Sequence, residues 1–237
     1  LADEGDRSAA QYDHARGGDD TLPSAPEDGT GFGYKSEAIL QRNVTAMKVV
    51  YIHGFAGSIH SNTVGELNKY YPQFEWCPIE VNHNVEESVG KINRFIKENP
   101  DVKCLIGSSL GGFYVLCADF AGRKLVVNPV LNPMSSLKQF VGTNKYRGRR
   151  ENGDTEFKFT MQDLFRFKKF TPRDTPMTIC HYTPNDQVLG DMKRDYQKFF
   201  THSEMTPDLQ NHFMNEHYIK HKLCEVLLPL LENEKTV

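Results

Sequence analysis

A serine set between glycines is the feature of this 237-residue chain that points most directly to chemistry. Ser109 is the centre of Gly107-Ser108-Ser109-Leu110-Gly111, a G-x-S-x-G pattern. This pattern carries chemistry where a strand turns sharply into a helix, because the turn exposes the hydroxyl above the sheet. A strand-like run, 102–107, precedes Ser109, and a mostly apolar helical run, 110–120, follows it. The sequence therefore predicts that Ser109 is a nucleophile at the positive end of a helix.

A serine hydroxyl is a weak nucleophile at neutral pH and needs a base that a third group holds in place. With this motif, an acid and then a histidine are expected further along the chain, each in a loop after a strand. Asp186 fits the acid, because it lies in a polar loop after the strand-like run 176–182. Asp191, which follows Gly190, is the alternative.

Four histidines are available as the base in the last part of the chain. His212 is preferred, because it lies in the segment that leads into the last helix, where a loop-borne ring is expected. His217 is the runner-up and falls in the first turn of that helix. The other two, His202 and His221, are expected to be solvated surface groups.

Two backbone N–H groups are expected to form an oxyanion hole, one after the nucleophile and one in the loop after the first strand. These are the amides of Leu110 and of Phe55, which lies in the run His53-Gly54-Phe55-Ala56-Gly57. We interpret His53 as a support for this loop rather than as a catalytic base.

The elements that must position these residues alternate from Met47 onward. The expected strands are 47–53, 74–81 (which Pro78 weakens or places near an edge), 102–107, 124–128 and 176–182; the expected helices are 61–71, 85–98, 110–120, 193–200 and 216–231, the last with Asn215 as N-cap and Pro229 in its final turn. This alternation predicts an α/β fold, with a mostly parallel central sheet and helices on both faces, as in α/β-hydrolases.

The chain is expected to divide into a tail and one domain. Residues 1–46 carry nine acidic and four basic side chains and few large apolar ones, so we expect a disordered tail, either native or a leader or other addition. Residues 47–237 form the expected domain. Within it, the stretch 133–175 has no clear strand and an excess of basic residues, and we expect a helical, lid-like insertion there.

Composition restricts the possible partners. A net charge of −3 gives no reason to expect nucleic acid or a membrane surface, and no apolar run approaches the ~18–20 residues of a membrane span. The five cysteines are widely spaced and form no CxxC pair, which favours reduced thiols in a cytoplasmic protein. No His, Asp or Glu cluster has the spacing of metal ligands, so no metal is expected.

Four short runs together carry a family resemblance: Ile52-His53-Gly54-Phe55, Gly107–Gly112, Asn128-Pro129 and Asn185–Leu189. In these runs the chain resembles the YqiA/YcfP-like bacterial esterase family (UPF0227-type), a branch of the α/β-hydrolase superfamily. The resemblance covers roughly 47–231. The chain has Asn211 where family members often have glycine before the histidine, and the strand expected there is weak.

The resemblance implies cofactor-free hydrolysis of carboxylic esters with short to medium acyl chains, by Ser109, Asp186 and His212. A thioester such as acyl-CoA is the alternative substrate, which the basic insertion would favour. A third hypothesis is a binding module that keeps the hydrolase fold without turnover, because fold alone does not establish chemistry.

Overall fold

A computed structural model of the chain describes residues 46–184, 186–202, 204–207 and 211–233. The tail expected over residues 1–46 therefore lies outside the described residues, except for Ala46. Within the described part, no helix is both long and apolar enough to cross a bilayer.

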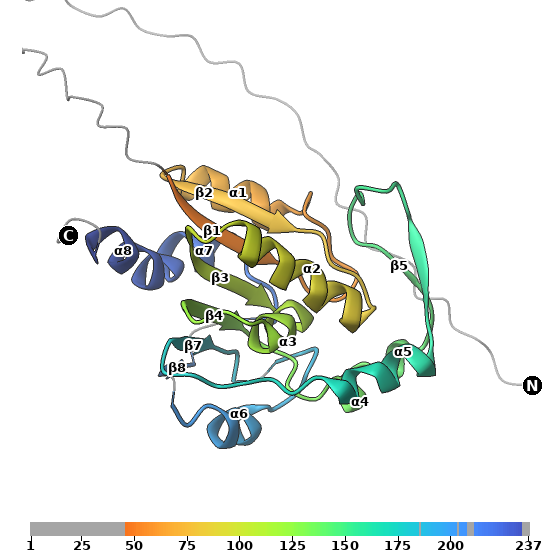
Figure 1. Cartoon of the computed structure of the whole chain (residues 1–237). Helices are drawn as coiled ribbons and strands as arrows, with labels where there is room; N and C mark the ends of the chain where they lie inside the picture. The colour runs from red at the N-terminus through yellow and green to blue at the C-terminus, as the bar shows by residue number, and fades with distance from the viewer. Residues whose placement is uncertain (1–45, 185, 203, 208–210, 234–237) are drawn as a thin grey trace, which may run out of the picture. The chain divides into compact units, whose positions relative to one another are not determined.

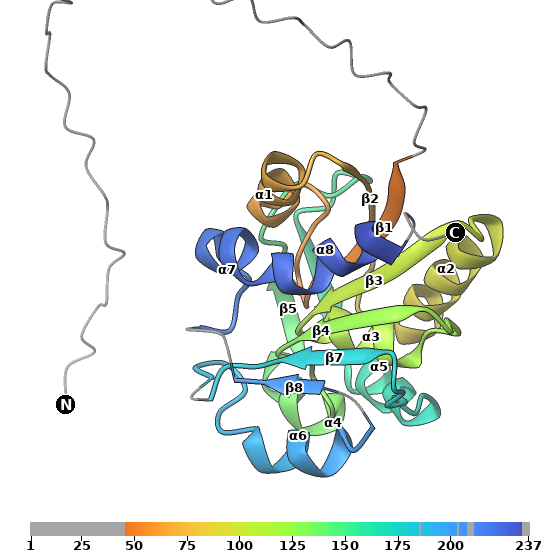
Figure 2. The ribbon, with the colours of Figure 1, turned by 90° about the vertical axis from the view of Figure 1, so that its left-hand side faces the viewer.

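Six parallel strands form the central sheet, in the order β2-β1-β3-β4-β7-β8 (Figures 1 and 2). The predicted α/β fold with a parallel sheet is confirmed. Because the strands are parallel, their carboxyl ends share one edge of the sheet, where loops from different strands can meet. The strands are β1 (Met47–Ile52), β2 (Phe74–Ile79), β3 (Val102–Ser108), β4 (Arg123–Val127), β7 (Thr178–His181) and β8 (Glu204–Thr206).

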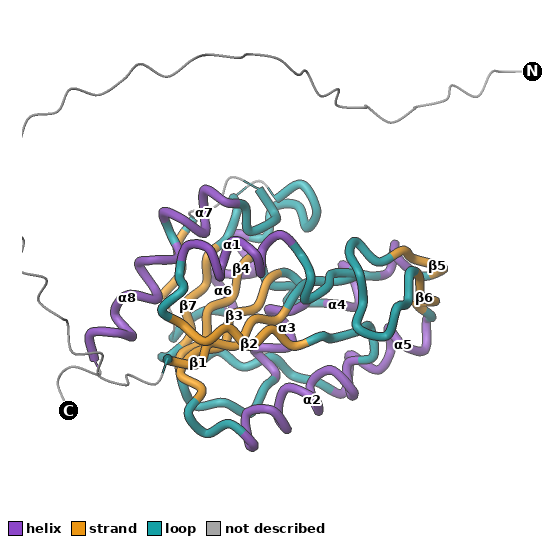
Figure 3. The backbone as a smooth tube through the Cα atoms, turned by 90° about the horizontal axis from the view of Figure 1, so that it is seen from above, coloured by secondary structure: helices purple, strands orange, loops and turns teal. Residues whose placement is uncertain are grey.

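Helices cover both faces of this sheet, as the view from above shows (Figure 3). One face packs against α1 (Asn62–Tyr70), α7 (Glu216–His221) and α8 (Leu223–Asn233), and Figure 2 shows α8 in front of the strands with α7 next to it. The other face packs against α2 (Val85–Glu98), α3 (Leu110–Cys117) and α6 (Lys193–Phe199).

The two cores follow from the two-residue period of a strand. In β1, Val49 and Tyr51 belong to the core under α1, α7 and α8, whereas Val50 and Ile52 belong to the core under α2 and α3. A strand buried on both faces has no polar side, which explains its continuous apolar sequence.

Several expected elements agree closely with the structure. Helix α2 spans the expected residues, and the Asn84 side chain caps it by accepting the N–H groups of Glu86 and Glu87 at 3.2 and 3.3 Å. Strand β2, which contains Pro78, is an edge strand. The expected helix 110–120 is shorter in the structure, because α3 ends at Cys117 and Ala118 adopts an extended conformation.

The expectation that the insertion 133–175 is helical is wrong in part, because it also contains two strands. This insertion contains an antiparallel hairpin, β5 (Gly142–Lys145) and β6 (Glu156–Phe159), between short helices. The Phe159 side chain is buried and the Phe157 side chain half-buried, so β6 turns alternate residues inward, whereas β5 has no large apolar residue to reveal it. The helical pieces are α4 (Pro133–Ser136), η1 (Lys138–Phe140), α5 (Met161–Arg166) and η2 (Phe167–Lys169).

The expected single last helix is also wrong, because it is divided at Lys222. The Lys222 N–H bonds to the Tyr218 carbonyl at 2.9 Å and closes α7, and the Glu225 N–H bonds to the Lys222 carbonyl at 3.1 Å as α8 begins. Asn215 caps α7 as expected, accepting the Tyr218 N–H at 2.9 Å. Pro229 lies inside α8.

Candidate active site

Ser109 lies between β3 and α3 with φ 56° and ψ −120°, a conformation rare for a residue with a side chain. Neighbouring loops hold it there: its N–H donates to the Val127 carbonyl at 2.9 Å, and its own carbonyl accepts the Val130 N–H at 3.1 Å. The Ser109 side chain has no hydrogen-bond partner among the described residues, and the residue lines a cavity. The hydroxyl is therefore available to a bound molecule.

Two glycines allow α3 to approach the sheet closely enough for this turn. A Cβ atom on Gly111 would lie 2.2 Å from the Ile52 carbonyl oxygen, and one on Gly107 would lie 2.4 Å from the Gly111 carbonyl oxygen. Both obstacles are backbone atoms, which no rotamer change can move. The glycines that flank Ser109 are thus required by packing.

Asp186 and His212 form a buried pair at the carboxyl edge of the sheet. Nδ1 of His212 lies 2.7 Å from Oδ2 of Asp186, and each side chain is only 2% exposed. The other carboxylate oxygen accepts the N–H groups of Val188 and Leu189 at 2.7 and 2.8 Å. Because Nδ1 faces the acid, Nε2 is the ring atom left for another partner.

The surroundings of Asp186 favour its ionised form. Burial acts to raise the pKa of this carboxyl, but the hydrogen bonds from His212 and from the amides of Leu189 and Val188 outweigh burial and hold the pKa below its usual value. An ionised Asp186 orients the His212 ring and stabilises a positive charge that forms on it.

The structure places the other candidate residues elsewhere. Asp191 is exposed and its carboxylate accepts the Lys193 N–H at 3.0 Å, at the start of α6. His217 and His221 are exposed in α7, with ring centroids 4.8 Å apart, and His202 pairs with Asp174 at the surface. The cavity beside Ser109 is lined by His212 and by none of these four residues.

Asn128 belongs to this site, although the sequence analysis named it only as part of the Asn128-Pro129 run and gave it no role. It is fully buried and has φ 45°. Its Nδ2 donates to the carbonyl of His212 at 3.0 Å and to that of Asn211 at 3.3 Å, and its Oδ1 accepts the Thr183 N–H at 2.7 Å. Asn128 therefore joins the end of β4 to the loops that carry the acid and the base. The available signal was Asn-Pro directly after a strand, since asparagine tolerates positive φ.

The two amides expected to form the oxyanion hole belong to Phe55, in the loop after β1, and to Leu110, directly after Ser109. Neither the Phe55 N–H nor the Leu110 N–H donates to another group among the described residues. Phe55 lines the same cavity as Ser109, whereas Leu110 lines a smaller adjoining pocket that Phe55 shares. His53 is buried beneath the loop, with Nδ1 2.9 Å from the Gly54 carbonyl, and it supports the loop as expected.

Backbone strain is concentrated around this cavity. Among the described residues, the non-glycine residues with positive φ are Ala56, Ser109 and Asn128. They lie in the loops that follow β1, β3 and β4, which are neighbours in the sheet.

The cavity that Ser109 lines has a volume of about 170 Å³, and more of its lining surface is apolar than polar. Arg147 is also part of its lining; its guanidinium lies 5.2 Å from the centroid of the exposed Phe213 ring. No acidic side chain of the described residues pairs with Arg147.

An open groove of about 700 Å³ adjoins the cavity and shares Ser136, Val188 and Leu189 with it. The apolar lining of the cavity consists of Phe55, Val130, Leu137, Phe140, Val188, Leu189, Phe213 and Met214.

Over the described ranges, no group of three or more His, Cys, Asp or Glu residues is arranged to hold a metal ion. All five cysteines are free thiols.

Comparison with known proteins identifies both the family and the fold. The model of an uncharacterised protein family, UPF0227, matches residues 48–226. No curated protein matches the chain.

Solved structures similar to this chain include an esterase domain from Rhodothermus marinus (16% identity, TM-score 0.52, 78% of this chain and 86% of that chain covered). Mouse alpha/beta hydrolase domain-containing protein 10 (13%, 0.54, 78% and 90%) and a monoacylglycerol lipase from Paleococcus ferrophilus (14%, 0.52, 78% and 93%) are similar to it as well. At these identities the likeness establishes the α/β-hydrolase fold.

Proposed function

The chain belongs to the UPF0227 family, and on that premise we propose that it is a serine hydrolase that cleaves carboxylic esters with short to medium acyl chains. The observation that carries the proposal is the buried 2.7 Å contact between Asp186 and His212, at the wall of the cavity that Ser109 also lines. A serine on a strained turn, a base and an orienting acid are the groups that acyl transfer requires.

In the proposed reaction, Oγ of Ser109 attacks the ester carbonyl carbon while Nε2 of His212 takes the hydroxyl proton. The negative oxygen of the tetrahedral intermediate accepts hydrogen bonds from the N–H groups of Phe55 and Leu110. The intermediate collapses, and the alcohol leaves with the proton from His212. Water then attacks the acyl-serine by the same route and releases the carboxylic acid.

The size of the cavity supports a small acyl group. An apolar cavity of about 150 Å³ binds a benzene molecule, and the cavity beside Ser109 measures about 170 Å³. We therefore expect the greatest kcat/KM for acyl chains of about four to six carbons, with longer chains extending into the groove.

The test measures hydrolysis of p-nitrophenyl butyrate by the wild type and by Ser109→Ala. We expect kcat to fall by a factor of order 10⁶, because the three residues act as a unit. A fluorophosphonate probe should label the wild type and not this variant. Retention of activity by Ser109→Ala, or failure of the wild type to react with either reagent, contradicts the proposal.

The same assay distinguishes the two candidate bases. His212→Ala should lower kcat by several orders of magnitude, whereas His217→Ala should leave it near the wild-type value. The opposite pattern would assign the base to His217.

Hydrolysis of an anionic thioester such as acyl-CoA is a second candidate, and Arg147 is the observation that favours it. This cation lies in the cavity lining, is exposed, and has no acidic partner among the described residues, while the groove leaves room for a large leaving group. We expect Arg147→Gln to lower kcat/KM for butyryl-CoA, at low salt in particular, and to spare p-nitrophenyl butyrate. Equal effects on both substrates contradict the anionic reading.

A further inference from the structure

A buried guanidinium from the insertion lies against the loop that carries Phe55. Arg150 follows β5 and is only 6% exposed. It donates to the Gly57 carbonyl at 2.8 Å and to the Val81 carbonyl at 2.7 Å, and it forms an ion pair with Glu80. Its guanidinium also lies 4.4 Å from the centroid of the Tyr146 ring. A buried charge with this many partners is held in one position.

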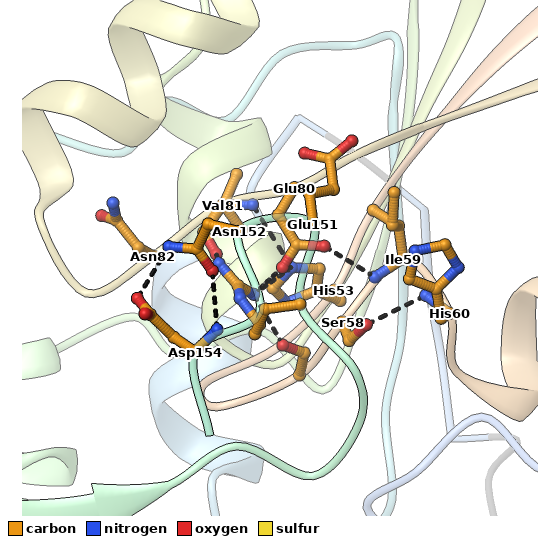
Figure 4. Close-up of polar contacts among 12 residues, drawn as sticks. His53, Ser58, Ile59, His60, Glu80, Val81, Asn82, Glu151, Asn152 and Asp154 are labelled. Carbon is orange, nitrogen blue, oxygen red and sulfur yellow. Dashed lines mark hydrogen bonds and ion pairs between the residues drawn. The ribbon is translucent and has the colours of Figure 1, made fainter. Parts of the chain in front are cut away.

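The partner carboxylate extends the same network to the far end of the loop. Figure 4 shows Glu80 beside His53, with a contact from Glu80 to Ile59. Oε2 of Glu80 accepts the Ile59 N–H at 3.2 Å. Burial acts to raise the pKa of Glu80, but the hydrogen bond from the Ile59 amide and the Arg150 charge act to hold it below the usual value. Glu80 is therefore ionised at neutral pH and matches the guanidinium charge.

His53 completes the network on the near side of the loop. Its Nε2 accepts the Val81 N–H at 3.3 Å and lies 3.3 Å from Nη1 of Arg150. With Nε2 accepting, the ring proton is on Nδ1, which donates to the Gly54 carbonyl at 2.9 Å.

Backbone contacts from the insertion hold the centre of the loop. The Arg147 N–H donates to the Ala56 carbonyl at 2.8 Å, and the Ser58 hydroxyl donates to the Arg149 carbonyl. Figure 4 shows Ser58 also in contact with His60, whose N–H donates to its hydroxyl at 3.0 Å. Positions on both sides of Phe55 are thus fastened, while the Phe55 N–H itself is left without an acceptor among the described residues.

We propose that Arg150 is a positioning residue for the oxyanion hole: through Gly57, Glu80 and His53 it fixes the loop that presents the Phe55 N–H to the substrate. In this proposal, residues 146–150 of the insertion hold the loop that carries Phe55 in a fixed position. This inference rests on the proposed serine hydrolase activity and adds a residue outside the triad to it.

The decisive variant removes both charges together, Glu80→Leu with Arg150→Met. Replacing a buried ion pair by apolar residues of similar size is often neutral or stabilising, so loss of the two charges should not by itself unfold the protein. The Gly57 and Val81 carbonyls and the Ile59 N–H lose their partners, so we expect a folded protein with a lowered Tm. Loss of one oxyanion donor lowers kcat about 10²- to 10³-fold. For a displaced donor we expect a loss of about tenfold to hundredfold in kcat on p-nitrophenyl butyrate, with KM changed less than about threefold.

A rescue experiment separates positioning from mere folding. Arg150→Ala leaves a space beside Glu80, and millimolar guanidinium ion should restore part of its kcat. The matched control is Lys158→Met, which removes an exposed cation of the same hairpin and should neither lose activity nor respond to guanidinium.

The outcomes are distinct from those of the triad experiment. Wild-type kcat in a folded double variant overturns the role of Arg150 and leaves the proposed hydrolase intact. A double variant with lowered kcat and unchanged KM, together with rescue of Arg150→Ala, supports that role. A wild type that neither hydrolyses esters nor reacts with the fluorophosphonate overturns both proposals.

Discussion

At the scale of single residues, Asn128 provides the sharpest test of how the acid and base loops are held. We expect Asn128→Asp to be more damaging than its small chemical change implies. Aspartate tolerates positive φ and still accepts the Thr183 N–H, but its second oxygen would face the carbonyl oxygens of Asn211 and His212. The carboxylate would therefore repel the His212 loop.

For Asn128→Asp we predict a fall in kcat of about tenfold or more, and a loss of about 1–3 kcal/mol in unfolding free energy from buried groups left without partners. Initial rates on p-nitrophenyl butyrate and urea unfolding measure the two effects. Asn68→Asp changes an exposed asparagine of α1 and serves as the control. Equal behaviour of the two variants would show that Asn128 does not hold the site.

Residue types and their order along the chain predicted the pairing that the structure displays between Asp186 and His212. The serine, the acid and the base can each be found in the sequence because each must lie in a loop that follows a strand. Asn128 escaped this reasoning because most of its partners are main-chain groups far along the chain, such as the His212 carbonyl and the Thr183 N–H. Main-chain partners leave no trace in residue types, so Asn-Pro after a strand signalled the backbone conformation of Asn128 but not these contacts.

At the scale of elements, the closeness of α3 to the sheet predicts opposite effects for two helical glycines. A Cβ atom on Gly111 would meet the Ile52 carbonyl oxygen at 2.2 Å, whereas one on Gly90 in α2 would meet nothing within 4 Å. We expect Gly111→Ala to destabilise the protein by about 1–3 kcal/mol or more. Gly90→Ala should stabilise it by about 0.5–1 kcal/mol, because alanine favours the helix.

Thermal or urea unfolding of both alanine variants checks this prediction. Gly111→Ala should also lower kcat, because displacing α3 moves Ser109 and the Leu110 N–H. If Gly111→Ala is as stable and as active as the wild type, α3 is not held against β1 as closely as the structure has it.

The elements that the sequence predicted well are those buried on both faces or with a complete amphipathic stripe, such as β1, β3 and α2. The hairpin of β5 and β6 was missed because its strands have four residues each and β5 exposes polar side chains. Strand β8 has three residues, too few for a periodic signal. Elements this short form because of the tertiary surface on which they pack, and their own sequences carry no clear periodic pattern.

At the scale of the whole molecule, buried carboxylates make stability depend on pH. The pKa values of Glu80 and Asp186 lie below their ordinary values of 4.5 and 3.8 in the folded protein. Their contribution to stability is therefore complete above those ordinary values and is lost as pH falls through the lower, folded-state values.

We predict that the urea midpoint of unfolding changes little between about pH 7 and 5 and then decreases in acid. Glu80→Gln should show a shallower decrease below about pH 4.5, because it removes one of the carboxylates whose pKa folding lowers. Glu98→Gln, an exposed position at the end of α2, is the control. A Glu80→Gln curve parallel to that of the wild type would exclude a linkage through this residue.

The left-handed backbone at Ala56, Ser109 and Asn128 has a consequence for how such a protein can evolve. Ala56 and Ser109 depart from the conformation their residues prefer, at a cost of about 1–2 kcal/mol each, and Asn128 at a smaller cost because asparagine tolerates positive φ. Heat resistance and turnover then make competing demands on the same three positions, because relaxing any of them would strengthen the fold and blur the geometry that turnover needs. In a lineage that adapts to higher temperature, we therefore expect stabilising substitutions to lie far from the carboxyl edge of the sheet, where they do not lower turnover.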